Sequence, residues 1–332
     1  RLDIPAQLEV IPILDFGGQY TQLIARRVRE AGAFSVLVAP GISIDELRQI
    51  NPRGIILSGG PSSGTELDAP RCHDRIFELG VPVLGICYGM QLACQILGCK
   101  VDAGESGEFG RAKVTIHDAS DLLNGIPSQT TVWMSHGDQV LGVDEQFHTL
   151  AGTPTCPFAA VRHKKFPFYG VQFHPEVTHT PHGVDILRNF LYEVCGCTGT
   201  WRMADFMESE CVRLRKQIGK GRVICGLSGG VDSSVVAALL HKAIGSQLTC
   251  IFVDNGLLRK NERQLVEATF RDHFEIDLRV VDASIEFLSD LKGVTEPQEK
   301  RRRIGHRFIE VFKNSAAHIS DDGHGHVRFL AQ

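Results

Sequence analysis

Short runs of Val, Ile and Leu alternate with helical patterns along much of this 332-residue chain, and that order constrains its fold more than any single motif does. In roughly the first 190 residues, the alternating segments are strand candidates at 9–16, 53–60, 81–86 and 167–173 and helical patterns at 20–32 and 183–194. Strands that alternate with helices are typical of a mainly parallel sheet covered by helices. We therefore predict an α/β fold.

The same alternation begins again after a glycine-punctuated connector, CGCTGTW, at 195–201. Strand candidates at 222–227 and 248–254 are each followed by a helical pattern, at 232–245 and 261–274. A length of 332 residues also suits two domains, since a domain averages about 150 residues. We predict one domain at 1–197 and a second at 198–332, each a mainly parallel sheet covered by helices.

Composition and charge disfavour several classes of function. The formal net charge is −4 at pH 7, and the basic run EKRRR at 299–303 is typical of a solvated helix face, so we expect no nucleic-acid partner. No apolar run approaches the ~20 residues that cross a bilayer, and the initial RLDIPAQLEV lacks the pattern of a signal peptide. The ten cysteines are too sparse for a disulfide scaffold. We therefore expect a cytoplasmic protein without a membrane partner.

One cysteine lies where a nucleophile would be expected. In VPVLGICYGMQ at 81–91, a strand candidate runs through G-x-C-x-G into a helical pattern at 88–97. A nucleophile elbow has this arrangement, because flanking glycines make room for a tight turn from which the nucleophile projects. Cys87 would also lie at a helix N-terminus, where N–H groups and the helix dipole favour a thiolate. A buried core cysteine at a strand end is the alternative.

A thiolate nucleophile needs a base that shuttles protons and a partner that orients the base. QFHPE offers both, because His174 and Glu176 are two residues apart and would face the same side of an extended segment. Pro175 favours that extended geometry at His174. LSGGP at 57–61 can turn backbone N–H groups toward an oxyanion, and the N–H of Tyr88 can complete that site. Together these elements predict acyl transfer from an amide or ester through a thioester.

SGGP, GICYGMQ and FHPE resemble the class I glutamine amidotransferase family, which hydrolyses glutamine to glutamate and passes the ammonia onward; the resemblance covers about residues 10–195. It implies that fold and a catalytic triad of Cys87, His174 and Glu176. The implied oxyanion donors are Gly60 and Tyr88. The implied contacts to glutamine are Gln91, Ser135, His136 and Asp138. The last three lie in WMSHGDQV at 133–140, which is similar to the family's loop beside the glutamine; without the family it would be a polar strand end.

LSGGVDSSV at 227–235 follows a strand candidate and opens a helical pattern. Glycines let the backbone approach a ligand closely, the hydroxyls of Ser228, Ser233 and Ser234 can donate, and a helix N-terminus favours an anion. The segment lacks the lysine of G-x-x-x-x-G-K-[ST], which excludes a P-loop NTPase. Asp232 suits a phosphate site if a divalent cation bridges it to a nucleotide. A serine-capped helix start is the alternative.

SGGVDS resembles the pyrophosphate loop of the N-type ATP pyrophosphatase family, which adenylylates a carbonyl oxygen and releases pyrophosphate. The resemblance implies a Rossmann-like adenine nucleotide hydrolase fold, ATP as substrate, and Mg²⁺ held through the nucleotide by Asp232. FVDNGLLR at 252–259 lies at the carboxyl end of the next strand, where open α/β sheets bind ligands. The implied ATP-binding residues are Ser228, Gly229, Gly230, Val231, Asp232, Ser233, Ser234 and, through its backbone, Val253.

The order of the two domains, together with FVDNGLLRKNE and TEPQEKRRRIGHRFIEVF, resembles the glutamine-hydrolysing GMP synthase family. That family adenylylates XMP with ATP and lets ammonia displace AMP, which gives GMP and pyrophosphate. The sequence ends at HVRFLAQ, where the family continues into further XMP contacts and a dimerisation domain. We therefore expect these 332 residues to lack two parts of the family protein: the region that completes the XMP site, and the domain through which the full-length family protein forms a homodimer. Gly18 stands where the family commonly has serine, and we expect little consequence.

Two other functional classes remain open from the sequence. One is another glutamine amidotransferase, or a cysteine hydrolase, fused to a nucleotide-sensing module. If the chain is such a hydrolase, we expect ATP and XMP to leave its rate of glutamine hydrolysis unchanged. The other is a regulatory binding protein that has lost its chemistry, and the intact triad residues argue against it. Cys195 with Cys197, and HISDDGHGH at 318–326, are weaker metal-site candidates; a buried or linker pair and a solvated loop are the preferred interpretations.

Overall fold

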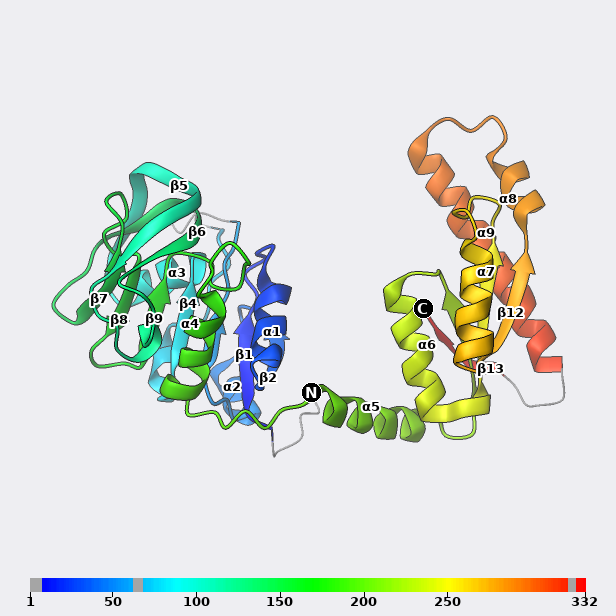
Figure 1. Cartoon of the computed structure of the whole chain (residues 1–332), viewed down its shortest axis with the longest axis horizontal. Helices are drawn as coiled ribbons and strands as arrows, with labels where there is room; N and C mark the ends of the chain where they lie inside the picture. The colour runs from blue at the N-terminus through cyan, green and yellow to red at the C-terminus, as the bar shows by residue number, and fades with distance from the viewer. Residues whose placement is uncertain (1–7, 62–67, 322–326) are drawn as a thin grey trace. The chain divides into compact units, whose positions relative to one another are not determined.

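The computed structural model describes residues 8–61, 68–321 and 327–332 of the chain. The chain divides into two compact units, Arg1–Met203 and Ala204–Gln332, and each is described by itself (Figure 1). The end of the glycine-rich connector packs with the first unit, since the Trp201 N–H donates to the Gly32 carbonyl at 3.0 Å and the Trp201 ring contacts Phe34. The division between the units therefore falls after the connector.

Within the described residues, the first unit is built on a nine-stranded mixed sheet. Its parallel half runs in the order β2 (Phe34–Val38), β1 (Val10–Leu14), β3 (Ile55–Leu57), β4 (Val83–Ile86) and β9 (Phe168–Val171). Beyond β9 every pairing is antiparallel, through β8 (Ala160–His163), β7 (Phe147–Gly152), β5 (Lys100–Ile116) and β6 (Gln129–Gly142). The predicted α/β class is confirmed, but only half of the strand pairings in this sheet are parallel. The connections β7–β8, at 153–159, and β8–β9, at 164–167, are too short for a parallel crossover.

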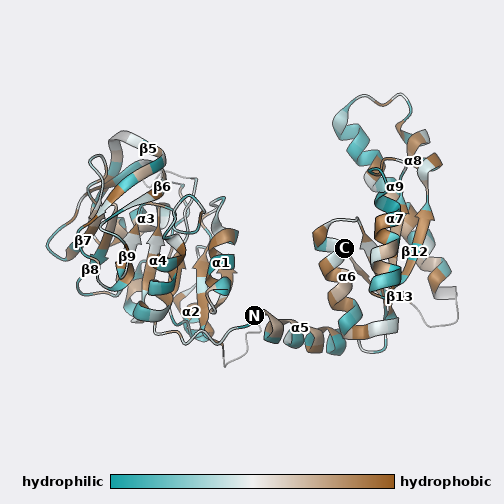
Figure 2. Cartoon of the chain, viewed as in Figure 1, coloured by the Kyte–Doolittle hydropathy of each residue, from teal (hydrophilic) through white to brown (hydrophobic). Residues whose placement is uncertain are grey.

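Helices cover both faces of this sheet. One group consists of α1 (Thr21–Glu30), the 3₁₀ helix η2 (Asp121–Leu123) and α4 (Gly183–Asn189), which continues as the π-helix η3 (Phe190–Val194). The other consists of α2 (Ile44–Ile50), the 3₁₀ helix η1 (Asp74–Leu79) and α3 (Tyr88–Ile96). Successive strand residues face opposite sides, so Ile13 of β1 packs with the first group and Leu14 with the second. Figure 2 shows helices that carry apolar residues beside polar ones, as expected when one side is buried.

Two glycines allow α3 to lie directly against the strands beneath it. A Cβ at Gly85 would lie 2.7 Å from the backbone of Met90, and a Cβ at Gly89 would lie 2.3 Å from the Leu57 carbonyl oxygen. With glycine present, the Gly89 N–H donates to the Ser58 carbonyl at 3.1 Å. The glycines of G-x-C-x-G are therefore required by the close packing of β3, β4 and α3.

Within the described residues, the second unit contains a four-stranded, fully parallel sheet. Its order is β12 (Asp277–Asp282), β11 (Leu248–Asp254), β10 (Arg222–Leu227) and β13 (Val327–Ala331). One core contains residues of α5 (Met203–Ile218), α6 (Val231–Ile244), α7 (Glu262–Glu267) and its π-helical continuation η5 (Ala268–His273). The other contains residues of α8 (Ser284–Leu291) and α9 (Pro297–Asp321), and η4 (Gly245–Gln247) leads into β11. This sheet confirms the parallel α/β architecture predicted for the second domain.

The basic run at 299–303 lies on α9. Glu299 forms ion pairs with Arg302 at 2.7 Å and Arg303 at 2.8 Å, which is the solvated helix face predicted from the sequence. None of the described helices combines the length with the apolar character that crossing a membrane requires.

The contact at Gly89 leads to a test of stability. Gly89→Ala is expected to lower the free energy of unfolding by about 1–3 kcal/mol, because the added methyl group meets backbone atoms rather than a flexible side chain. Urea unfolding followed by circular dichroism measures the change. Gly142→Ala is the control, since a Cβ at Gly142 meets nothing within 4 Å. Equal unfolding midpoints for the two variants would contradict the packing argument.

Candidate active site

Cys87 occupies a strained turn between β4 and α3. Its φ of +52° and ψ of −110° form a conformation that costs a non-glycine residue about 1–3 kcal/mol. The turn is held because the Cys87 N–H donates to the Val171 carbonyl of β9 at 2.8 Å, while α3 begins at the next residue. The side chain lines a pocket. The turn thus has the geometry of a nucleophile elbow.

His174 and Glu176 follow β9 and meet in a hydrogen bond. The distance from His174 Nδ1 to Glu176 Oε1 is 2.7 Å, and both residues are buried. The backbone of His174 is fixed on both sides, since its N–H donates to the Trp133 carbonyl at 2.9 Å and its carbonyl accepts from the Thr180 hydroxyl at 2.7 Å. The pair meets in a turn at 175–176, rather than in the extended segment that the sequence suggested.

These contacts favour a protonated His174. Burial lowers the pKa of His174, but hydrogen bonds to Cys87 and Glu176 and the charges of both groups together raise it to about 10. Glu176 Oε2 is buried without a hydrogen-bond partner among the described residues, so the carboxylate acts on the imidazole through Oε1. An imidazolium beside the sulfur can stabilise a thiolate and later donate a proton.

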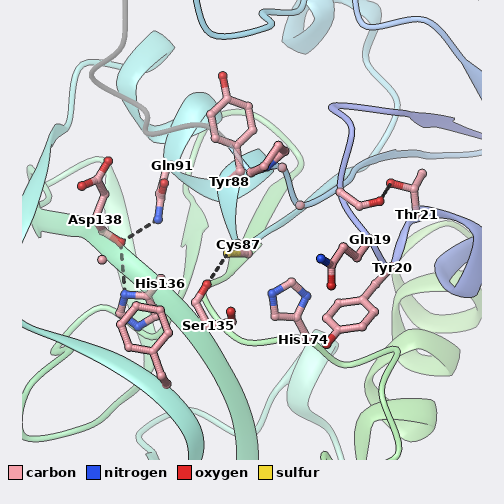
Figure 3. Close-up of a pocket in the computed structure, with 16 residues that line it drawn as sticks. Gln19, Tyr20, Thr21, Cys87, Tyr88, Gln91, Ser135, His136, Asp138 and His174 are labelled. Atoms are coloured by element: carbon pink, nitrogen blue, oxygen red, sulfur yellow. Dashed lines mark hydrogen bonds between the residues drawn. The ribbon is translucent and has the colours of Figure 1, made fainter. Parts of the chain in front are cut away.

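Cys87 and His174 face one pocket of about 470 Å³, whose lining is drawn in Figure 3. Small-molecule sites typically enclose about 300–1,000 Å³. The predicted site residues that line the pocket are Gly60, Cys87, Tyr88, Gln91, Ser135, His136, Asp138 and His174. The other lining residues are Gly59 and Pro61 of the LSGGP segment, and Gly18, Gln19, Tyr20, Thr21, Phe109 and Gly137, to which no role was assigned from the sequence. Those at 18–21 follow the carboxyl end of β1, a position that could have pointed to them, whereas no sequence signal marks Phe109.

The two predicted oxyanion donors, Gly60 and Tyr88, line the same pocket as Cys87. Gly60 follows β3 and Tyr88 opens α3. A Cβ at Gly60 would lie 3.0 Å from the Phe16 carbonyl oxygen, so this loop has little room for a side chain. Gly18 has more consequence than expected, because a Cβ there would lie 2.4 Å from the Gly59 carbonyl oxygen. A serine at position 18 would therefore require the loop to shift.

The segment at 133–140 belongs to strand β6 rather than to a loop. The Ser135 carbonyl accepts from the Cys87 thiol at 3.7 Å. The Asp138 carbonyl accepts from Gln91 Nε2 at 2.7 Å and from His136 Nδ1 at 3.1 Å (Figure 3). Since the Gln91 amide nitrogen is used in this way, its carbonyl oxygen is the group that can face a ligand. His136 forms part of the pocket wall.

The second candidate site lies where β10 ends and α6 begins. Gly229 has a φ of +78°, and Gly230 is the N-cap residue of α6. The hydroxyls of Ser228 and Ser233 lie 3.0 Å apart, and the Ser234 hydroxyl donates to the Gly230 carbonyl at 2.7 Å. N–H groups in the first turn of a helix have no partner within the helix, so this end of α6 can bind an anion.

The topology of the second sheet places this loop where α/β proteins bind ligands. β11 and β12 lie on one side of β10 and β13 lies on the other, so the strand order reverses beside β10. Ligands bind outside the carboxyl ends of the strands at such a point. Val253 is buried near the carboxyl end of the neighbouring β11. Asp232 is exposed in the first turn of α6, where its carboxylate suits a hard divalent cation.

Comparisons with known proteins agree with the two halves of the structure. The family model described as glutamine amidotransferase class-I matches residues 12–194. A protein from Thermoplasma acidophilum, named as one component of a GMP synthase, has a crystal structure that aligns with a TM-score of 0.53 and 33% identity, over 62% of this chain and 99% of that one. The chain belongs to the class I glutamine amidotransferase family. Residues 221–296 match the model described as the tRNA methyl transferase HUP domain.

Similar proteins extend across both units. The proteins named GMP synthase [glutamine-hydrolyzing] from Acetivibrio thermocellus and Staphylococcus epidermidis are 52% and 51% identical to this chain, over 98% and 100% of its length. The chain spans 62% and 63% of the lengths of these two relatives.

The weaker metal-site candidates gain no support. Cys195 and Cys197 pack against the first core, and burial raises the pKa of both thiols, that of Cys197 to about 11, as expected of a buried pair. Residues 322–326 of the HISDDGHGH segment lie outside the described residues.

The His174–Glu176 contact predicts a shift in titration. Glu176→Gln is expected to lower the pKa of His174 from about 10, because both the hydrogen bond and the charge of Glu176 raise it. The imidazolium would then lose its proton at a lower pH than in the unchanged protein. NMR titration of histidine-labelled protein measures this, with His163 as the internal reference, since burial lowers the pKa of His163. Identical His174 titrations in both proteins would exclude this role for Glu176.

Proposed function

We propose that the full-length protein is a glutamine-hydrolysing GMP synthase, and that this chain supplies its glutaminase and its ATP-binding site. One observation carries the proposal. Cys87, on its strained turn, lines the same pocket as His174, and His174 is hydrogen-bonded to Glu176. Two further findings support it. Relatives about half identical along the chain bear that name, and the second unit has a loop at a helix N-terminus, beside the point where the strand order of its sheet reverses.

Glutamine hydrolysis would begin at Cys87. Its sulfur attacks the side-chain carbonyl carbon of glutamine, and the carbonyl oxygen becomes an oxyanion that the N–H groups of Gly60 and Tyr88 stabilise. Protonated His174 gives its proton to the departing nitrogen. The C–N bond breaks, ammonia leaves, and a thioester to Cys87 remains.

Water then completes the cycle. Neutral His174 accepts a proton from the water that attacks the thioester carbon, and a second oxyanion forms in the same place. Its collapse breaks the C–S bond, which releases glutamate and restores the thiolate beside a protonated His174. Glu176 orients the imidazole through Nδ1 and stabilises its positive charge. Gln91, Ser135 and Asp138 would hold the glutamine, with His136 as part of the wall.

The second unit would activate the acceptor. The N–H groups and hydroxyls at 228–234 bind the phosphates of ATP, and the Val253 backbone contacts the adenosine. The C2 oxygen of XMP attacks the α-phosphorus, so pyrophosphate leaves and an adenylylated ring forms. Ammonia then attacks the ring carbon and displaces AMP, which gives GMP. Asp232 would hold Mg²⁺ through the nucleotide, and this ion would offset the negative charge of the phosphates.

We also propose that the full-length protein is cytoplasmic. The Cys87 thiol must stay reduced to act as a nucleophile, and the cytoplasm keeps thiols reduced. The homodimer of the complete family protein is proposed for the full-length protein.

Isotope transfer tests the division of labour. Full-length protein supplied with amide-¹⁵N glutamine, ATP and XMP is expected to place ¹⁵N in the GMP, as measured by mass spectrometry. Cys87→Ala should abolish glutamine-dependent GMP formation and preserve formation from ammonia, because the second site needs no thiol. Equal loss of both activities would refute the two-site scheme, and unlabelled GMP would exclude nitrogen transfer.

Asp232 gives a separate test of the nucleotide site. Asp232→Asn is expected to raise the KM for Mg-ATP at least about tenfold, since one charged ligand of the nucleotide-bound ion is lost. Alkylation of Cys87 by iodoacetamide should be unchanged. Asp272→Asn, another exposed aspartate of the second unit, should leave both measurements unchanged. Normal use of Mg-ATP by the Asp232 variant would show that the metal role is wrong.

A further inference from the structure

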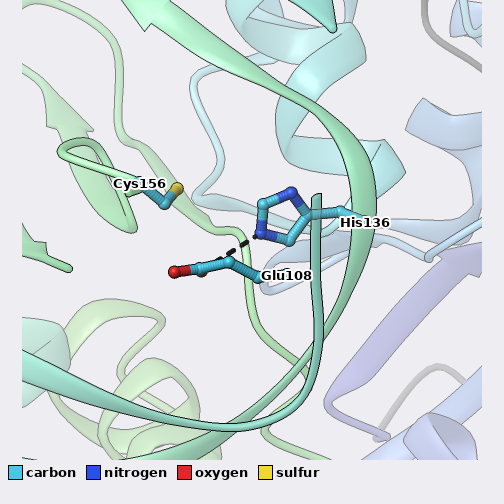
Figure 4. Close-up of side chains that lie close together, drawn as sticks. All are labelled: Glu108, His136 and Cys156. Carbon is cyan, nitrogen blue, oxygen red and sulfur yellow. Dashed lines mark ion pairs between the residues drawn. The ribbon is translucent and has the colours of Figure 1, made fainter. Parts of the chain in front are cut away.

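A second cluster of ligand-type side chains lies beside the glutamine pocket and has no chemical step assigned to it. Glu108 of β5, His136 of β6 and Cys156, which follows β7, bring together a carboxylate oxygen, a ring nitrogen and a sulfur (Figure 4). These atoms all lie within 4.8 Å of one another. Neither Glu108 nor Cys156 was a candidate from the sequence, because strands distant along the chain bring them together.

The tautomer of His136 is set by its contact on the pocket side. Its Nδ1 lies 3.1 Å from the Asp138 carbonyl oxygen, which can only accept, so Nδ1 carries the proton. In the neutral ring, Nε2 then has a lone pair. This nitrogen lies 3.5 Å from Glu108 Oε2. When the ring is neutral, the two acceptor atoms therefore face each other without a hydrogen between them.

Both facing atoms are buried, and their one contact is with each other, an ion pair only when the His136 ring is protonated (Figure 4). Glu108 Oε2 and His136 Nε2 have no hydrogen-bond partner within the described residues. His136 is 4% exposed and Cys156 is 0% exposed. Opposing buried acceptors are unfavourable, because each has lost water and neither can donate to the other. A cation between them would satisfy both.

The surroundings of Glu108 leave its free oxygen for the cluster. The other oxygen, Oε1, accepts hydrogen bonds from the hydroxyls of Thr153, at 2.8 Å, and Thr155. The Thr153 hydroxyl also accepts from the Cys156 N–H at 2.8 Å, so the turn that carries the sulfur is tied to the same carboxylate. Hydrogen bonds of this kind orient the ligands of metal sites.

We propose that Glu108, His136 and Cys156 bind a divalent transition-metal ion, with Zn²⁺ as the ion that fits best. Imidazole, thiolate and carboxylate are all zinc ligands, whereas Mg²⁺ and Ca²⁺ prefer oxygen ligands. Tetrahedral zinc holds its ligand atoms about 3.3–3.8 Å apart, so atoms at the 4.8 Å limit must approach each other by about 1–1.5 Å. The Cys156 thiol loses its proton to solvent as the sulfur–metal bond forms, and water takes the fourth position.

Such an ion would link three segments and stiffen the pocket wall. It would join β5, β6 and the turn after β7 through one ligand from each. It would also fix His136, whose Nδ1–H donates to the same Asp138 carbonyl that accepts from Gln91. The inference does not depend on the proposed function, because metal binding can be measured without glutamine or ATP.

Co²⁺ is the probe for this site, because a thiolate ligand gives a sulfur-to-cobalt charge-transfer band in the near ultraviolet. The full-length protein carries Cys87→Ala, so that Cys87 and His174 cannot bind the ion together. We expect one Co²⁺ per chain, with that band, and displacement by Zn²⁺. Adding Cys156→Ala should remove the band and the stoichiometric binding. Adding Cys72→Ala instead removes another buried thiol and should change neither.

Glu108→Gln supplies a test in which Cys156 and all the other cysteines except Cys87 remain in place. In the Cys87→Ala protein it is expected to weaken Co²⁺ binding by about tenfold or more, while the band persists at saturation. Circular dichroism of the metal-free variants checks their folding, and if Cys156→Ala does not fold, the Glu108 variant decides. The proposal is overturned by the absence of a cobalt–thiolate band, by a band that survives Cys156→Ala, or by unchanged affinity in Glu108→Gln.

Discussion

The positive φ of Cys87 is the constraint on which the site of the first unit depends. A cysteine with a φ of +52° is strained, and the surrounding packing must hold it there. The Val171 carbonyl accepts from its N–H, and α3 lies so close to β3 that Gly89 admits no side chain. This arrangement directs the sulfur toward the pocket that His174 also lines. Without the strain, the thiol would be one more buried cysteine at the end of a strand.

Both candidate sites use the junction between a parallel strand and the helix that follows it. At the β4–α3 junction, the helix N-terminus favours a negative sulfur, while at the β10–α6 junction it favours an anionic ligand. The glycines differ in their purpose. Gly89 is required because a helix touches a strand, whereas Gly229, with a φ of +78°, lets the loop turn beneath the place where phosphates are proposed to lie. One electrostatic property of helices thus serves two kinds of chemistry.

The local motifs allowed much of the candidate site to be predicted. The elbow at Cys87, the pairing of His174 with Glu176 and the loop at 228–234 depend on residues close together in the sequence, so spacing alone indicated them. The antiparallel half of the first sheet was missed, because strand direction there depends on which strands pair across long separations. For the same reason, the family resemblance indicates a loop at 133–140 although the segment pairs with β5, as the alternative of a strand end implies, and the sequence gives no sign that Gly18 approaches Gly59.

The sequence by itself determined the two α/β units, the elbow cysteine, the histidine with its carboxylate partner and the phosphate-type loop, because each follows from periodicity or from a short motif whose geometry is local. Only the tertiary structure decided which groups share a pocket and which buried atoms lack partners. The cluster of Glu108, His136 and Cys156 shows the difference. Its members lie 20 or more positions apart in the sequence, and only strand pairing and the turn after β7 place their ligand atoms together.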